Sequence, residues 1–134
     1  MFDIRKRYGF NKQLATDGVW IPLDPDDEGG ARVRVASFDS PRYMQGMQDL
    51  LQRRQLDGYT DRDPLSRSEM DGLAAQYIVT DWEGIYEGDT LVPYSQENAE
   101  RFLQDYPEFR TRVFNAAGRR QTFQLQQEEF IAKN

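Results

Sequence analysis

The stretch Met70–Phe109 reads MDGLAAQYIVTDWEGIYEGDTLVPYSQENAERFLQDYPEF, and it decides the fold. Apolar residues recur in its first part at spacings of three and four: Met70, Leu73, Ala74, Tyr77 and Ile78. This spacing places them on one face of an α-helix. We therefore expect a helix over 67–82, with Trp82 at its end and Gly84 in the left-handed turn that stops it.

The second part of the stretch predicts a tight hairpin and another helix. Glu87, Gly88, Asp89 and Thr90 form a polar tip with apolar residues on both sides, which is typical of a hairpin or a short loop. Ser95 then precedes a segment with apolar residues at helical spacing. A serine in this place accepts a hydrogen bond from a free backbone N–H, so we expect a helix over 96–105.

A capping box marks the start of the 67–82 helix, and two more segments are predicted to be helical. The spacing Ser66-x-x-Glu69 is that of a capping box, and it opens the 67–82 helix. Ser40-Pro41 opens a helix over 41–57, because proline is tolerated in the first helical turn. After Tyr106-Pro107, apolar residues predict one or two terminal helices over 107–132, with a possible break at Gly118.

Residues 10–38 are predicted to form a β-hairpin region. Gly18–Leu23 is apolar, and Pro22 favours an edge strand because proline lacks a ladder donor. Ala31–Phe38 alternates apolar and basic residues, so we expect its arginines to face solvent or an acidic neighbour. Residues 1–134 then form one compact domain, mainly α with a small N-terminal antiparallel β-hairpin (α+β). Met1–Gly9 is expected to be a frayed terminus.

The composition excludes several classes of chemistry. The chain has 134 residues, no histidine and no cysteine, which removes imidazole bases, thiol nucleophiles and the commonest metal ligands. Its net charge is −6, so we expect no nucleic-acid partner. No apolar run approaches the ~20 residues that span a bilayer. We expect no membrane partner, no cofactor and no metal.

Carboxylates are the remaining candidates for catalysis or for a cation site. Asp81 with Glu83, and Asp61 with Asp63, are spaced two apart, so neither pair would share a helix face. Asp24–Gly29 resembles the start of a calcium loop, but Val35 stands where the twelfth-position acid belongs. We interpret all of these as solvated acids, and we predict that the protein is not an enzyme.

Aromatic residues are the candidates for partner binding. Trp82 has two interpretations, a core anchor or a binding hot spot, and Trp20, Tyr86 and Tyr94 share this ambiguity. A second candidate is an apolar groove on the terminal helices, and the alternative is that this face packs on the 67–82 helix. The groove would be formed by Phe109, Val113, Phe123 and Phe130, with a charged rim of Arg110, Arg112, Arg119, Arg120, Glu128 and Glu129. The high aromatic content also predicts self-association.

Several of these motifs resemble those of the tail assembly chaperones of long-tailed, siphovirus-type bacteriophages. The matching residues are Trp82-Glu83-Gly84-Ile85, Pro93-Tyr94-Ser95-Gln96-Glu97-Asn98-Ala99, Asp105-Tyr106-Pro107-Glu108-Phe109 and Ser40-Pro41-Arg42-Tyr43. The resemblance covers most of the chain, from about Phe10 to Asn134, and its motifs are structural rather than catalytic.

The resemblance implies a non-enzymatic chaperone that binds the tape measure protein and helps to recruit tail tube subunits. Such a protein works as a homo-oligomer in the host cell cytoplasm and is absent from the mature virion. The alternative is a structural virion component, either a head–tail joining or a tail completion protein. A carboxylate-based hydrolase is the third class.

Overall fold

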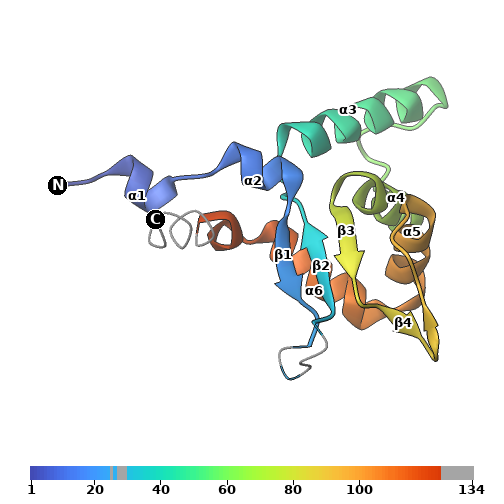
Figure 1. Cartoon of the computed structure of the whole chain (residues 1–134). Coiled ribbons are helices and arrows are strands. Elements are labelled where there is room, and N and C mark those ends of the chain that lie inside the picture. The colour runs from blue at the N-terminus through green and yellow to red at the C-terminus, as the bar shows by residue number, and fades with distance from the viewer. Residues whose placement is uncertain (25, 27–29, 125–134) are drawn as a thin grey trace.

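The computed structural model describes residues 1–24, 26 and 30–124, in which helices alternate with short antiparallel strands (Figure 1). In chain order the elements are α1 Ile4–Tyr8, α2 Lys12–Asp17, β1 Val19–Pro22, β2 Arg32–Val35, α3 Pro41–Leu56, α4 Arg67–Tyr77, β3 Val79–Glu83, β4 Tyr86–Glu87, β5 Thr90–Leu91, α5 Gln96–Asp105 and α6 Pro107–Gly118. Residues 120–124 are also helical.

Strands β1, β2 and β3 form an antiparallel sheet with β2 in the middle. Pro22 ends the edge strand β1, as predicted from its missing donor. The register places Arg32 opposite Glu83, and the Arg32 Nε donates to Glu83 Oε2 across 2.8 Å. The prediction of an acidic neighbour is therefore confirmed for Arg32.

The predicted helix over 67–82 is wrong at its C-terminal end. Helix α4 ends at Tyr77, and Val79–Glu83 is strand β3. The β-branched pair Val79-Thr80 disfavours another helical turn, and β2 offers a partner whose arginines match the acids of β3. Gly84 does adopt a positive φ of 70°, but it follows a strand rather than a helix.

The predicted mainly helical fold with antiparallel strands is confirmed, but the strands are not confined to an N-terminal hairpin. The sheet gains β3 from the middle of the chain, and β4 and β5 form a second hairpin at the predicted tip, where Gly88 has a φ of 61°. The 10–38 region also contains helix α2, capped by the Asn11 side chain. The segment expected to fray includes the short helix α1.

The predicted helix starts are confirmed by their caps. The Ser40 hydroxyl accepts from Tyr43 N, and the Ser95 hydroxyl accepts from Asn98 N. Ser66 and Glu69 form both hydrogen bonds of the capping box. These local signals set the starts of α3, α5 and α4 respectively.

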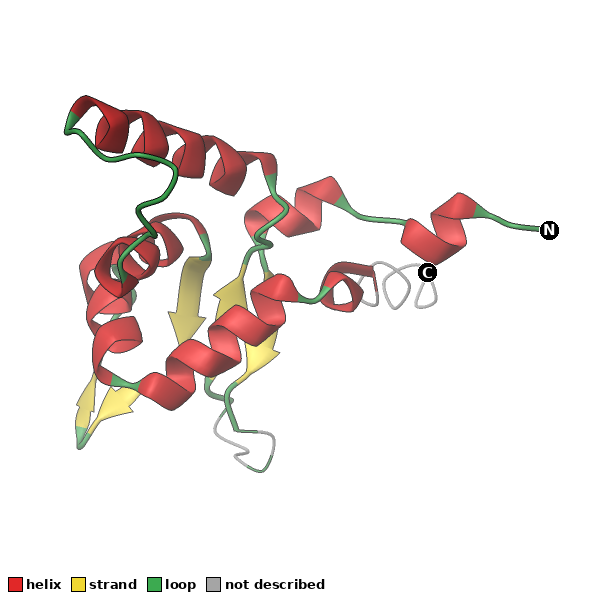
Figure 2. Ribbon diagram, turned by 180° about the vertical axis from the view of Figure 1, so that it is seen from behind, coloured by secondary structure: helices red, strands yellow, loops and turns green. Residues whose placement is uncertain are grey.

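The main core lies between the sheet and helices α4, α5 and α6. Figure 2 shows α6 running across one side of the sheet, with α4 and α5 beside it. The core includes Val33, Val35, Ile78, Val79, Trp82, Phe102, Leu103 and Val113. A second, smaller cluster joins Ala15, Val19 and Phe123, so the 120–124 segment packs on α2 and β1 rather than on α6. The helix is interrupted at Arg119, between the two helical segments and next to the break that was predicted at Gly118.

Candidate interaction surfaces

Trp82 belongs to the core. Its side chain is buried, and its indole Nε1 donates to Val92 O across 2.8 Å. The ring stacks on Phe102 with centroids 4.9 Å apart, and it meets Tyr94 and Phe109 edge-on. A partner could reach this ring only if the core opened, so the core interpretation of Trp82 holds in this structure.

The predicted terminal groove does not exist as one open face in the described residues. Val113 is fully buried in the main core, and Phe123 is fully buried in the second cluster. Phe109 is half-buried against the main core, and Phe130 lies outside the described residues. Two of the four predicted groove residues therefore serve packing.

Two of the six residues proposed for the charged rim are engaged elsewhere, and Glu128 and Glu129 lie outside the described residues. Arg110 Nε donates to the buried Asp71 Oδ1 across 2.7 Å, and Arg112 Nη2 donates to Pro22 O. Both arginines tie α6 to the rest of the molecule. They hold the helix in place instead of framing an opening.

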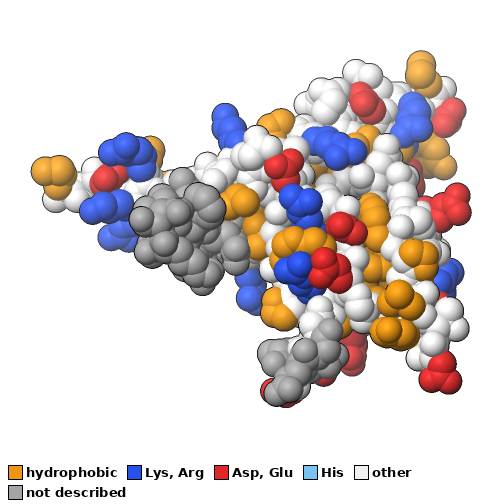
Figure 3. Space-filling model, viewed as in Figure 1, with side chains coloured by type: hydrophobic (Ala, Val, Ile, Leu, Met, Phe, Trp, Pro, Cys, Tyr) orange, Lys and Arg blue, Asp and Glu red, His pale blue; other side chains and the backbone are white. Residues whose placement is uncertain are grey.

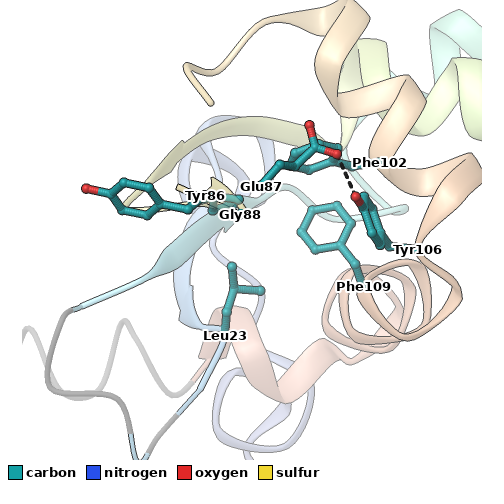
Figure 4. Close-up of a pocket in the computed structure, with 8 residues that line it drawn as sticks. Leu23, Tyr86, Glu87, Gly88, Phe102, Tyr106 and Phe109 are labelled. Carbon is teal, nitrogen blue, oxygen red and sulfur yellow. Dashed lines mark hydrogen bonds between the residues drawn. The ribbon is translucent and has the colours of Figure 1, made fainter. Parts of the chain in front are cut away.

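A pocket of about 410 Å³ opens between the β4–β5 hairpin and the junction of α5 and α6 (Figure 4). Its lining residues are Leu23, Ile85, Tyr86, Glu87, Gly88, Phe102, Tyr106 and Phe109. Tyr86 is 59% exposed and Phe109 half-buried, so two predicted binding residues lie at this pocket. A third, Tyr94, is half-buried in the core and donates its hydroxyl to Val79 O.

One ion-pair network anchors the hairpin side of the pocket. Arg101 donates two hydrogen bonds to Glu87, at 2.9 and 2.8 Å, and the Tyr106 hydroxyl donates to Glu87 Oε2 at 2.5 Å. The hydrogen bonds from Arg101, and then that from Tyr106, lower the pKa of Glu87 to about 2. The carboxylate stays charged at neutral pH and fixes the hairpin to α5.

Three exposed acidic residues are adjacent in sequence to residues that line the pocket. Asp89, Asp105 and Glu108 are exposed, and each directly neighbours a lining residue in sequence. Within the part of the chain that the structure describes, none of the three forms a salt bridge. The pocket lining is therefore mainly apolar, with Glu87 as its charged residue, and exposed acids neighbour it in sequence.

Helix α3 carries a second apolar surface. Tyr43, Gly46, Leu50 and Arg54 face the body, where Gly46 lies against the Tyr77 ring. Met44 and Leu51 remain 53% and 43% exposed, with half-buried Met47 between them. We call these three residues the α3 band. The sequence held a signal for it, because the apolar positions from Tyr43 to Leu51 span a wider arc than one buried face needs.

One carboxylate of each pair considered for catalysis has a structural partner. Glu83 pairs with Arg32, and Asp63 accepts from both the backbone N–H and the hydroxyl of Thr60. Residues 1–24, 26 and 30–124 hold no group of three or more acidic, histidine or cysteine side chains placed for a metal ion. In the same described residues, none of the helices has the length and apolarity that crossing a bilayer requires.

The family described as YdaY prophage protein matches residues 39–134, which is more than half of the chain. The chain belongs to this YdaY prophage protein family. It is therefore a protein of phage origin. Comparison with curated proteins and with solved structures found no match. The YdaY segment begins just before α3, so it includes the α3 band and every lining residue of the pocket except Leu23.

Proposed function

We propose that this prophage protein is a non-enzymatic tail assembly chaperone that binds the tape measure protein and helps to recruit tail tube subunits. Its phage origin supports this role. The motifs that resemble the chaperones supply further support, since they form the caps and turns around α3, α5 and α6. The observation that carries the proposal is the α3 band.

The α3 band fits a helical partner. Met44, Met47 and Leu51 follow one another at spacings of three and four, the pattern of a helix seam that packs against another helix. Methionine side chains adapt to irregular apolar surfaces, which suits a long client with many similar but unequal stretches. The resemblance implies such a client, because a tape measure protein is long and rich in amphipathic helices.

The charge around the α3 band favours apolar binding over electrostatic binding. Its exposed neighbours on α3 are mainly the uncharged glutamines Gln45, Gln48, Gln52 and Gln55. A contact of this kind depends weakly on salt, since rim charges govern the rate of encounter more than the affinity. The tape measure complex should therefore survive washing at high ionic strength.

Co-expression with the long coiled-coil tail protein of the same prophage tests the role. Wild-type protein should co-purify with that partner, and the double variant Met44→Glu with Leu51→Glu should not. Gln45→Glu with Gln52→Glu is the matched control, because it also adds two negative charges at exposed positions of α3 outside the α3 band. Equal recovery of the partner by all three proteins would place the client surface elsewhere, and no recovery by wild type would reject the role.

The composition of the virion separates this role from a joining or completion protein. A chaperone acts in the host cytoplasm and leaves before the tail is finished, so purified virions should lack the chain. A completion protein stays in the particle. Mass spectrometry of induced, purified particles gives the answer, and a stoichiometric amount of the chain in them would favour the structural alternative.

A further inference from the structure

The N-terminal arm, residues 1–8, projects from the body and presents apolar side chains to solvent (Figure 1). No residue of α1 is buried, and Phe2, Ile4 and Tyr8 are 64%, 64% and 57% exposed. A helix of five residues is not stable by itself in water. An arm of this composition gains stability when its apolar residues are covered.

The arm and the rest of the chain have opposite charge. Three basic residues and Asp3 give the arm a net charge of +2. The whole chain has a net charge of −6, so the residues outside the arm together carry −8. Figure 3 shows basic and apolar side chains together on the arm, with one acidic side chain among them, and side chains of both signs on the rest of this face. The arm therefore favours an apolar surface with an acidic edge.

The pocket beside the β4–β5 hairpin is the candidate for such a surface. Its apolar lining encloses about 410 Å³, within the size range of sites that accept an aromatic group. Exposed Asp89, Asp105 and Glu108 are adjacent in sequence to the lining residues Gly88, Tyr106 and Phe109. The apolar lining suits the apolar side chains of the arm, and the negative charge of these neighbouring acids is opposite to the positive charge of the arm.

An arm cannot reach the pocket of its own copy in this fold. Figure 1 places the N-terminus and the β4–β5 hairpin at opposite ends, with the sheet between them. The arm leads directly into α2, where Ala15 is buried and its carbonyl accepts from Ser37 N across 2.8 Å. Folding back would require α2 to leave the sheet, so the occupant comes from another molecule.

We propose that the arm of one copy docks in the hairpin pocket of a second copy, with Phe2 or Ile4 in the cavity and Arg5, Lys6 and Arg7 near the neighbouring acids. Each copy then gives an arm at one end and receives an arm at the other. This contact is heterologous, so it builds rings or open chains rather than closed two-fold dimers. It needs no client, and it stands or falls separately from the chaperone role.

A mixing experiment with full-length protein tests the contact. The arm variant is Phe2→Ser with Arg5→Glu, and the pocket variant is Tyr86→Lys with Glu108→Lys, all at exposed positions. Wild type should form species larger than dimers as concentration rises, measured by sedimentation velocity. Each variant alone should be monomeric. An equal mixture should form a heterodimer and nothing larger, because it retains only one intact arm and one intact pocket per pair.

Salt and a matched control complete the test. Self-association of wild type should weaken at least several-fold between about 0.05 M and about 0.5 M NaCl, since exposed charges are screened over this range. Lys12→Glu changes an exposed basic residue just outside the arm and should leave assembly unchanged. Monomeric wild type at high concentration, variants that assemble like wild type, or a mixture that stays monomeric would each overturn the proposal.

Discussion

Arg110 on α6 holds the carboxylate of Asp71 on α4 across 2.7 Å, and this pair joins two helices that are distant in sequence. Asp71 is fully buried, while the Arg110 side chain is 20% exposed. Arg67 lies farther from the same carboxylate, at 3.9 Å. Arg110 is therefore the main compensation for a buried charge at the α4–α6 contact.

Replacing Arg110 alone should lower the free energy of unfolding. Arg110→Met keeps most of the side-chain volume but leaves Asp71 buried without its main partner, and we expect a loss of about 3 kcal/mol in the free energy of unfolding. Urea denaturation followed by circular dichroism measures it. Adding Asp71→Asn removes the buried charge and should recover part of the loss. A double variant less stable than Arg110→Met would contradict this account.

Truncation of Trp82 should destabilise the whole fold. Trp82→Ala removes a buried ring that contacts Phe102, Tyr94 and Phe109, and large aromatic truncations of this kind cost ~3–5 kcal/mol. Trp82→Phe keeps an aromatic ring and leaves Val92 O without its donor, so it should cost about 1–2 kcal/mol. Thermal melting measures both. Unchanged melting with lost partner binding would instead make Trp82 a binding residue.

The sequence predicted those features that neighbouring residues control. The caps of α3, α4 and α5 depend on residues three positions apart, so Ser40, Ser66 and Ser95 indicated the helix starts correctly. The β4–β5 turn was equally local. Strand β3 was missed because its hydrogen-bond partner β2 lies far away in the chain, and a helical apolar stripe led directly into it.

The binding surfaces were harder to predict for the same reason. The pocket combines Leu23 after β1, the β4–β5 hairpin, Phe102 on α5 and Phe109 on α6. No local pattern brings these four segments together. Apolar spacing alone also could not separate Val113, which is buried in the core, from Met44, which remains exposed on α3. Exposure depends on which neighbouring element packs on each face.

The Glu87 network should make stability depend on pH in the acidic range. The folded pKa of Glu87 is lowered from 4.5 to about 2, so its contribution is complete above about pH 5 and is lost as the pH falls toward 2. Melting temperature measured across this range should fall less steeply for Glu87→Gln than for wild type. Some slope remains, because Glu69 and Glu83 also have lowered pKa values. Parallel curves would exclude the network as a contributor.

At the contact between α3 and α4, replacing a glycine with alanine should lower the stability of the protein, which is opposite to the usual effect. In most helix interiors, replacing glycine with alanine stabilises by about 1 kcal/mol. A Cβ added at Gly46 would overlap the ring of Tyr77, so either the ring or the whole of α3 has to move. We therefore expect Gly46→Ala to lower the melting temperature instead of raising it.

A second background isolates the cause. In Tyr77→Ala protein the ring is gone, so adding Gly46→Ala should be neutral or stabilising, as helix propensity alone requires. The sign of the Gly46→Ala effect should thus reverse between the two backgrounds. If the client binds the α3 band, the effect of Gly46→Ala on client recovery should reverse in the same way, because the band moves with the helix. Destabilisation of equal size in both backgrounds would mean that the ring of Tyr77 does not set the distance between α3 and α4.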